Sequence, residues 1–220
     1  GEAGDKLSGN ALLNSLLGAE VHYVATRDER APTMAALAEQ LRRQGRHPYE
    51  IPLGASTPLG ALGLARGVGE LVVQGVVPDV IVHSSSSGGT QAGLVAGCAV
   101  LGLPSRVLGI SADDPAASIR DTVRGIISGM GAWLGLDGDT FAQPLVIDVD
   151  DTFVGDGYGV PTPASEEAAE WLARQEAILV DQTYTAKALA GLMAHWRRGS
   201  FAGVHTVLFW HTGGQVGLFT

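Results

Sequence analysis

The fold class is decided by the stretch DVIVHSSSSGGTQAGLVAGCAVL, residues 79–101. Its first part, Asp79 to His83, is a mainly apolar run of strand length, and its last part, Gln91 to Leu101, is an apolar run of helix length. The polar turn Ser84 to Thr90 joins the two. A strand, a glycine-containing turn and a helix in this order predict one unit of an α/β fold.

The same alternation of helices and strands extends in both directions from this unit. Further helices are predicted at 10–17, 33–44, from Gly60 to about Gly75, and at 116–130, 166–175 and 185–197. Further strands are predicted at 20–25, 106–110, 144–148 and 204–210, and another extended piece begins at Tyr49. This pattern predicts a largely parallel sheet whose ligands gather at the carboxyl ends of the strands. Because it begins with a helix and no preceding strand, we expect the sheet to start upstream of Gly1.

Composition and charge narrow the class of protein. The chain has 220 residues, of which 45% are hydrophobic and 17% charged, as expected of a globular protein. Its apolar runs are too short to span a membrane, and its net charge of −9 argues against a nucleic-acid partner. The six histidines are scattered and Cys98 is the single cysteine, so no metal site is predicted. We expect a cytoplasmic protein.

The turn from Ser84 to Thr90 is the first candidate site. A strand-to-helix turn presents backbone N–H groups and hydroxyls to an anion at the positive end of the helix, so a phosphate fits there. The alternative is a flexible serine-rich connector, although flexible connectors seldom lie between a buried strand and an apolar helix. The nucleotide signatures GxxxxGK[ST] and GxGxxG after a strand are absent, as is the GxSxG nucleophile elbow.

A second glycine-bearing turn, His211-Thr212-Gly213-Gly214, follows the predicted strand 204–210. Because both turns lie at carboxyl ends of strands, they can share one ligand. Taken alone, His211 is either a hydrogen-bonded structural histidine or a residue that faces a substrate.

Several motifs together resemble one enzyme family. They are 51–63 (IPLGASTPLGALG), 85–94 (SSSGGTQAGL), 157–163 (GYGVPTP), 184–188 (YTAKA) and 208–214 (LFWHTGG), with Gly9-Asn10 and Leu16 to Glu20 before them. Their order and sequence resemble the D-cysteine desulfhydrase and 1-aminocyclopropane-1-carboxylate deaminase family. That resemblance implies the tryptophan-synthase-β-like fold, known as fold type II, with pyridoxal 5′-phosphate as cofactor. It also implies that 1–58 is the remainder of a small α/β domain and 59–220 a large cofactor-binding domain, N-terminally incomplete.

The resemblance also assigns roles to single residues. The cofactor phosphate is expected to bind Ser85, Ser87, Gly88, Gly89 and Thr90, the pyridine nitrogen to lie beside Thr185, and the substrate to lie near Tyr184, His211, Thr212 and Gly213, with Tyr184 as the catalytic residue. Ser86 stands where desulfhydrase-like loops usually have glycine, which bears on the geometry of the phosphate turn.

Thr185 bears on the choice of reaction. Deaminases tend to have Glu at this position, and a carboxylate favours a protonated ring more than a neutral hydroxyl does. Thr185 therefore favours β-elimination of the desulfhydrase type, whereas Gln91 is closer to the deaminase branch.

The family's Schiff-base lysine has no counterpart in this sequence. The chain contains only Lys6 and Lys187, and Lys187 aligns with a lysine that follows the Tyr-Thr pair and does not hold the cofactor. Three readings stay open: a fragment of an ordinary enzyme, one chain of a split enzyme whose N-terminal partner supplies the lysine, or a non-catalytic phosphate-binding subunit.

The predicted function is a pyridoxal-phosphate-dependent lyase. It converts a small amino acid such as D-cysteine into a keto acid, ammonia and sulfide, and the alternative is an aminocyclopropane-carboxylate deaminase. The family suggests a homodimer.

Overall fold

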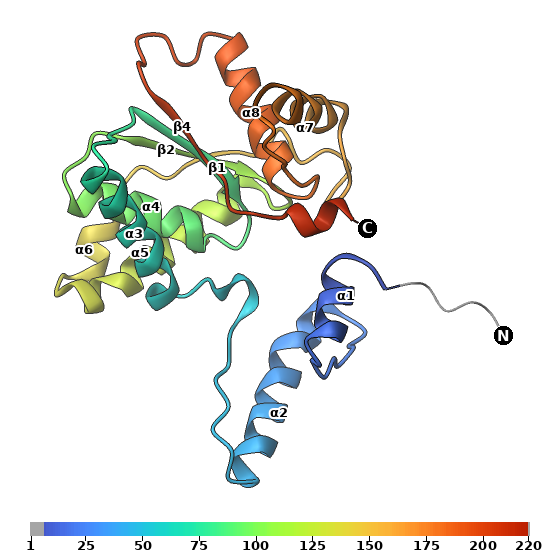
Figure 1. The fold of residues 1–220 in the computed structure, drawn as a ribbon. Helices are drawn as coiled ribbons and strands as arrows, with labels where there is room; N and C mark the ends of the chain where they lie inside the picture. The colour runs from blue at the N-terminus through green and yellow to red at the C-terminus, as the bar shows by residue number, and fades with distance from the viewer. Residues whose placement is uncertain (1–6, 220) are drawn as a thin grey trace. The chain divides into compact units, whose positions relative to one another are not determined.

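The structure, a computed structural model, describes residues 7–219. Its internal contacts divide the chain into two compact units, one that ends at Ala55 and one that begins at Ser56 (Figure 1). The assignment of the units as a small domain and a large cofactor-binding domain stays a prediction.

The first unit is helical. It contains α1 (Gly9–Leu16), a single 3₁₀ turn (Arg27–Glu29) and α2 (Arg30–Arg43), and it ends in a second 3₁₀ turn (Leu53–Ala55). The predicted strand at 20–25 is wrong: this segment is not a strand, and residues 7–55 contain none. A strand is stable only when its backbone groups pair with a neighbour, and the described part of this unit provides no neighbouring strand.

The second unit is built on a four-stranded parallel sheet. Its strands are β1 (Val80–Ser85), β2 (Arg106–Ser111), β3 (Asp148–Asp150) and β4 (Val207–Trp210), in the order β3-β2-β1-β4. Each of the three strand pairs is parallel, which confirms the predicted sheet type. The strand predicted at 144–148 is displaced, because only Asp148 to Asp150 pair with β2.

The helices of this unit lie on both faces of the sheet. They are α3 (Pro58–Val73), α4 (Gly89–Val100), α5 (Ala116–Leu134), α6 (Gly138–Ala142), α7 (Pro163–Glu176) and α8 (Thr185–Arg197), followed by a 3₁₀ turn (Gln215–Leu218). Figure 1 shows α7 and α8 on one side of the strands and α3, α4 and α5 on the other. The prediction placed helices at the positions of α3, α4, α5, α7 and α8, but not at α6 or at the 3₁₀ turn 215–218.

Alternation along β1 explains the two layers. Val80 and Val82 point into the apolar cluster that includes Ala188 of α8, whereas Ile81 points into the cluster with α3, α4 and α5. Successive side chains of a strand face opposite sides of the sheet, so both faces of β1 bury apolar area.

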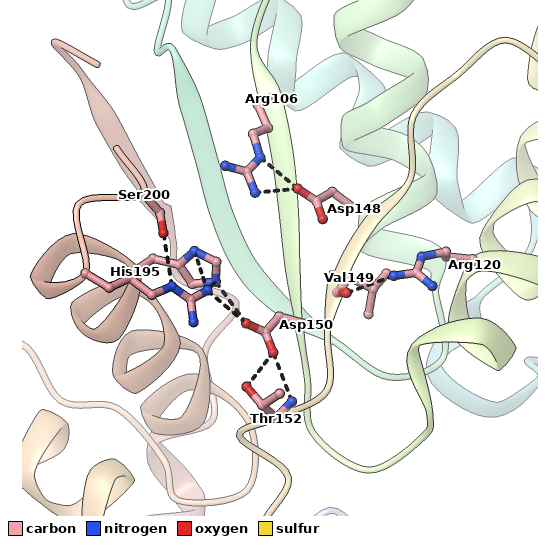
Figure 2. Close-up of polar contacts among 9 residues, drawn as sticks. Arg106, Arg120, Asp148, Val149, Asp150, Thr152, His195 and Ser200 are labelled. Atoms are coloured by element: carbon pink, nitrogen blue, oxygen red, sulfur yellow. Dashed lines mark hydrogen bonds and ion pairs between the residues drawn. The ribbon is translucent and has the colours of Figure 1, made fainter. Parts of the chain in front are cut away.

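The three acidic residues of the segment 148–151 each form a hydrogen bond or an ion pair with a neighbouring residue. Asp148 pairs with Arg106, with Nη2 at 2.6 Å, and Asp150 accepts hydrogen bonds from Thr152 and lies 2.9 Å from Nε2 of the buried His195 (Figure 2). Asp151 accepts the N–H of Ala116 at the start of α5. Charge pairing and helix capping therefore account for this acidic run.

Within the described residues, no helix is both long and apolar enough to cross a membrane.

Candidate functional site

The carboxyl ends of the parallel strands bring the predicted site segments to one edge of the sheet. The N–H of Ala112, which follows β2, donates to the carbonyl oxygen of Ser85 at the end of β1, at 3.0 Å. The ammonium of Lys187, in the first turn of α8, lies 3.5 Å from the carbonyl oxygen of the same Ala112. The serine-rich turn and the start of α8 are therefore connected through the end of β2.

The serine-rich turn is shorter than predicted, because β1 runs through Ser85 and α4 already begins at Gly89. Gly88 precedes the helix with a left-handed φ of 83°, a conformation that favours glycine. The first N–H groups of a helix have no partner in its own ladder and carry the positive end of its dipole. Backbone N–H groups at Gly88 and Thr90 are thus positioned for an anion, whereas the N–H of Gly89 has a partner within the protein.

Ser56 occupies part of this helix end and was not predicted as a site residue. Its Oγ accepts the N–H of Gly89 at 3.2 Å and donates to Oγ of Ser87 at 2.7 Å. A Cβ on Gly89 would lie 2.7 Å from this Oγ, closer than side chains approach in proteins. Ser56 lies in the motif 51–63, which is among those that resemble the family, but the sequence does not reveal that this motif contacts the start of α4.

The departure at Ser86 does not disturb the turn. Among the described residues, left-handed φ values outside glycine occur only at Ala55 and Ala177. Ser86 therefore has an ordinary backbone conformation, and glycine is not required there.

Ser85 differs from the other hydroxyl residues of the turn. It is 3% exposed, and its Oγ donates to Oε1 of Gln91 at 2.8 Å, inside the protein. Gln91 is fully buried, and its Nε2 donates to the carbonyl oxygen of Asp148 on β3 at 2.7 Å. Ser86, Ser87 and Thr90 are the residues of the turn 85–90 that carry a hydroxyl and are partly exposed, while the hydroxyl of Ser85 anchors α4 to the sheet.

The start of α8 is organised by Asp181, which was also not predicted. Its Oδ2 accepts the N–H groups of Thr183 and Tyr184, each at 3.0 Å, and its Oδ1 accepts the N–H of Thr185 at 3.0 Å. Oγ1 of Thr185 donates to the same Oδ1 at 2.7 Å. Asp181 lies three residues before Tyr184, the N-cap of α8, and the tendency of Asp to accept the N–H of a residue two positions later could have identified it.

Tyr184 lies beside a second tyrosine. Its hydroxyl forms a short hydrogen bond with that of Tyr158, and the two rings meet edge to face with centroids 5.6 Å apart. Burial raises the pKa of Tyr184 above its ordinary value, and the bond to Tyr158 adds to this, so Tyr184 is a neutral phenol at physiological pH. Tyr158 lies in the motif 157–163, but its role in the site was missed.

His211 has both ring nitrogens bound to backbone. Nδ1 accepts the N–H of Gly213 at 2.9 Å, so Nε2 carries the proton that it donates to the carbonyl oxygen of Leu179 at 2.8 Å. A Cβ on Gly214 would collide with Oδ1 of Asp181. The structure thus brings the turn 211–214 together with Tyr184 and Thr185 around Asp181, and leaves Thr212 exposed.

Lys187 has a structural environment. The side chain is fully buried, and its Nζ donates to the carbonyl oxygens of Val154 at 2.7 Å and Gly157 at 2.8 Å. Desolvation lowers its pKa from the ordinary value. The ammonium is thus committed to backbone oxygens, and that this lysine does not hold the cofactor stays a prediction. Lys6 lies outside the described residues.

Taken together, these groups suit a ligand with an anion at one end and a polar ring. The α4 end supplies N–H and hydroxyl donors around a glycine with no room for a Cβ, and the α8 end supplies two phenols and a buried hydroxyl. Within residues 7–219 no group of three or more His, Cys, Asp or Glu side chains is arranged to hold a metal. Pyridoxal phosphate has both features, so the residues fit this cofactor.

Comparisons with known proteins agree. D-cysteine desulfhydrase of Yersinia pestis is 34% identical over 216 residues, which are 96% of this chain and 64% of the relative. A Pyrococcus abyssi protein, whose name assigns it provisionally to 1-aminocyclopropane-1-carboxylate deaminase, is 34% identical over 97% of this chain and 64% of its own length. The chain thus spans slightly less than two thirds of these curated relatives.

Two solved structures are similar to the described fold. A crystal structure of an ACC deaminase homologue superposes with a TM-score of 0.86 and 32% identity, over 99% of this chain and 65% of that one. A crystal structure of a T.th. threonine deaminase superposes with a TM-score of 0.60 at 21% identity, over 94% of this chain and 66% of that one, which supports the fold alone. The fold is thus that of the type II pyridoxal-phosphate enzymes, as predicted.

The family model described as "Pyridoxal-phosphate dependent enzyme" matches residues 3–213. With this match across nearly the whole sequence, the chain belongs to the family of pyridoxal-phosphate-dependent enzymes.

Proposed function

We propose that this chain forms the phosphate-binding and ring-binding part of a lyase that acts on small amino acids. The reaction is β-elimination: D-cysteine, or a relative, and water give a keto acid, ammonia and sulfide. The observation that carries the proposal is the start of α4, where left-handed Gly88, crowded Gly89 and the hydroxyls of Ser56 and Ser87 surround the first N–H groups of the helix.

The residues of the turn divide the work of binding a phosphate. The N–H groups of Gly88 and Thr90 and the hydroxyls of Ser87 and Thr90 are its donors, while the N–H of Gly89 is donated to Oγ of Ser56. The hydroxyl of Ser85 does not contact the phosphate but stabilises the turn through its hydrogen bond to Gln91. The helix end contributes a favourable potential for a dianion without a cationic side chain.

The residues at the start of α8 bind the cofactor ring and the amino-acid substrate. When bound, pyridoxal phosphate withdraws electrons from the Cα of an amino acid. Thr185 is the partner of the ring nitrogen, and Tyr184 with Tyr158 faces the substrate. Because Tyr184 stays neutral, its phenol holds a proton that can be given to a departing group. The turn His211-Thr212-Gly213, which the bond from the Gly213 N–H to Nδ1 of His211 holds in place, contributes the exposed Thr212 hydroxyl to substrate binding.

The alternative reaction is opening of the ring of 1-aminocyclopropane-1-carboxylate. The buried Gln91 at the start of α4 favours it, whereas Thr185, in place of a carboxylate, favours β-elimination. Neither Lys187, which is committed to backbone carbonyls, nor another described residue supplies the amine that such chemistry uses. We propose that it comes from an N-terminal segment or a complementary chain, in a cytoplasmic homodimer.

The test measures sulfide and keto acid from D-cysteine, L-cysteine and 1-aminocyclopropane-1-carboxylate, with the chain alone and mixed with an N-terminal chain that supplies a lysine. Sulfide from cysteine, lost in Ser87→Ala combined with Thr90→Ala, supports the proposal. Ring opening alone establishes the alternative. Tight binding of cofactor with no turnover in any mixture establishes a non-catalytic binding subunit instead.

A further inference from the structure

Asp181 is a buried carboxylate that lies next to the predicted partner of the ring nitrogen. It is 3% exposed, and its two carboxylate oxygens accept four hydrogen bonds, three from backbone N–H groups and one from the hydroxyl of Thr185. A carboxylate only accepts hydrogen bonds, so this arrangement satisfies it fully from within residues 181–185.

Thr185 is therefore restricted in what it can offer a ligand. Its hydroxyl has one proton and two lone pairs. The proton is donated to Oδ1 of Asp181 at 2.7 Å, and one lone pair accepts the N–H of Asp181 at 2.9 Å. One lone pair is left, so toward a third group Thr185 acts as a hydrogen-bond acceptor. A group that binds it there must bring its own proton.

The side chain of Asp181 also contacts the second glycine-bearing turn. A Cβ on Gly214, whose φ is 100°, would collide with Oδ1 of Asp181, so the turn packs directly on this carboxylate. The same side chain thus fixes the hydroxyl of Thr185, the backbone of Tyr184 and the turn 211–214. Removal of its charge would affect all three.

We propose that Asp181 is a positioning residue that orients the Thr185 hydroxyl as an acceptor and so selects the protonated form of the cofactor's pyridine nitrogen. The inference rests on the proposed function, in which Thr185 is the partner of that nitrogen. It changes the expected chemistry, because a hydroxyl that is oriented by a carboxylate favours the protonated ring, whereas a hydroxyl alone has no such preference. The electron sink is then stronger than Thr185 alone suggests, and Thr185 no longer distinguishes β-elimination from ring opening by the strength of that sink.

The test uses pyridoxamine 5′-phosphate with a ¹⁵N-labelled ring, a probe that needs no lysine. We expect the ring nitrogen bound to the parent chain to give the ¹⁵N shift of the protonated form at pH 8. Asp181→Asn should move the signal toward the unprotonated position. Thr185→Val keeps the shape of the side chain and the three backbone N–H bonds to the Asp181 carboxylate but removes the acceptor of the Asp181 N–H, and it should do the same. Thr185→Ser should retain the parent signal.

The variants also separate two kinds of failure. If Asp181→Asn does not fold, the pair Thr185→Val and Thr185→Ser decides alone. An unprotonated ring nitrogen in the parent, or a ¹⁵N shift that Thr185→Val leaves unchanged, overturns the role of Asp181. If the probe still binds in that case, the proposed function stands. No binding of the probe, or binding that Ser87→Ala and Gly89→Ala do not weaken, overturns the proposed function and the inference together.

Discussion

The ammonium nitrogen of Lys187 lies 2.8 Å from the carbonyl oxygen of Gly157, the residue that precedes Tyr158. It also donates to the carbonyl oxygen of Val154, so one charged group on α8 binds two points of the loop 154–157. Tyr158 meets Tyr184 three residues before Lys187 along the chain. The lysine thus fixes the loop that carries one tyrosine to the helix whose start carries the other.

Replacement of Lys187 by Met should destabilise the second unit. Met fills a similar volume but leaves the carbonyl oxygens of Val154 and Gly157 without this donor, and we expect the free energy of unfolding to fall by about 2 to 4 kcal/mol. Urea unfolding measures this change. Arg174→Met, at an exposed ion pair with Glu170, is the control and should change stability by less than about 0.5 kcal/mol. Equal effects of the two variants would contradict the structural role of Lys187.

The parallel sheet and its helices were predictable because their signals are local. The range predicted for α8, 185–197, agrees with the structure, since an apolar face of helical period ends there in basic residues. The predicted strand at 20–25 failed because strand formation depends on a partner, which a single segment does not reveal. β3 was misplaced for the same reason: pairing with β2 selects Asp148 to Asp150 over the more apolar 144–147.

The site was predictable as a set of segments but not as a set of contacts. Turns at the ends of strands follow from the order of elements, which located the serine-rich turn and the turn 211–214. Ser56 and Ser87 are 31 positions apart, and no local pattern indicates that their hydroxyls meet. Likewise, nothing in the sequence shows that the Ser85 hydroxyl points inward to Gln91.

Gly89→Ala should weaken anion binding at the start of α4. The added Cβ would lie 2.7 Å from Oγ and 3.1 Å from Cα of Ser56, so the turn before α3 must move away. We expect the affinity for pyridoxamine 5′-phosphate, measured by calorimetry, to fall by about tenfold or more, which corresponds to about 1.4 kcal/mol. The matched control is Gly125→Ala in α5, where a Cβ would meet no atom of the described chain within 4 Å. It should keep the affinity and raise helix stability by up to about 1 kcal/mol. A normal affinity in Gly89→Ala would show that the ligand binds elsewhere.

Gln91→Leu should affect both stability and the turn. The substitution removes the acceptor of Ser85 and the donor to Asp148 from a fully buried position. Because both partners are left unsatisfied, we expect a loss of about 2 to 3 kcal/mol in the free energy of unfolding and faster amide exchange at 85–90. Gln74→Leu, at the exposed end of α3, is the control. Unchanged exchange in the turn would mean that Gln91 does not support it.

His83 should make the stability of the second unit depend on pH. The side chain is fully buried on β1, Nε2 has no hydrogen-bond partner among residues 7–219, and burial lowers the pKa to about 4 from an ordinary value of 6.5. The unfolded chain therefore binds a proton at this residue before the folded chain does. The associated stability is present above pH 6.5 and is lost as the pH falls toward 4, by about 3 kcal/mol in total.

His83→Leu removes the titrating group and also the unsatisfied nitrogen. We expect its free energy of unfolding to depend less on pH between 6.5 and 4 than that of the parent, so that the difference between the two proteins changes by about 3 kcal/mol across this interval. Urea unfolding at several pH values measures that difference directly. His205→Gln, at an exposed histidine, should follow the parent. If His83→Leu and the parent lose stability in parallel, an acceptor such as water reaches the protonated Nε2 in solution, and the imidazole is protonated within the fold at a higher pH than burial alone allows.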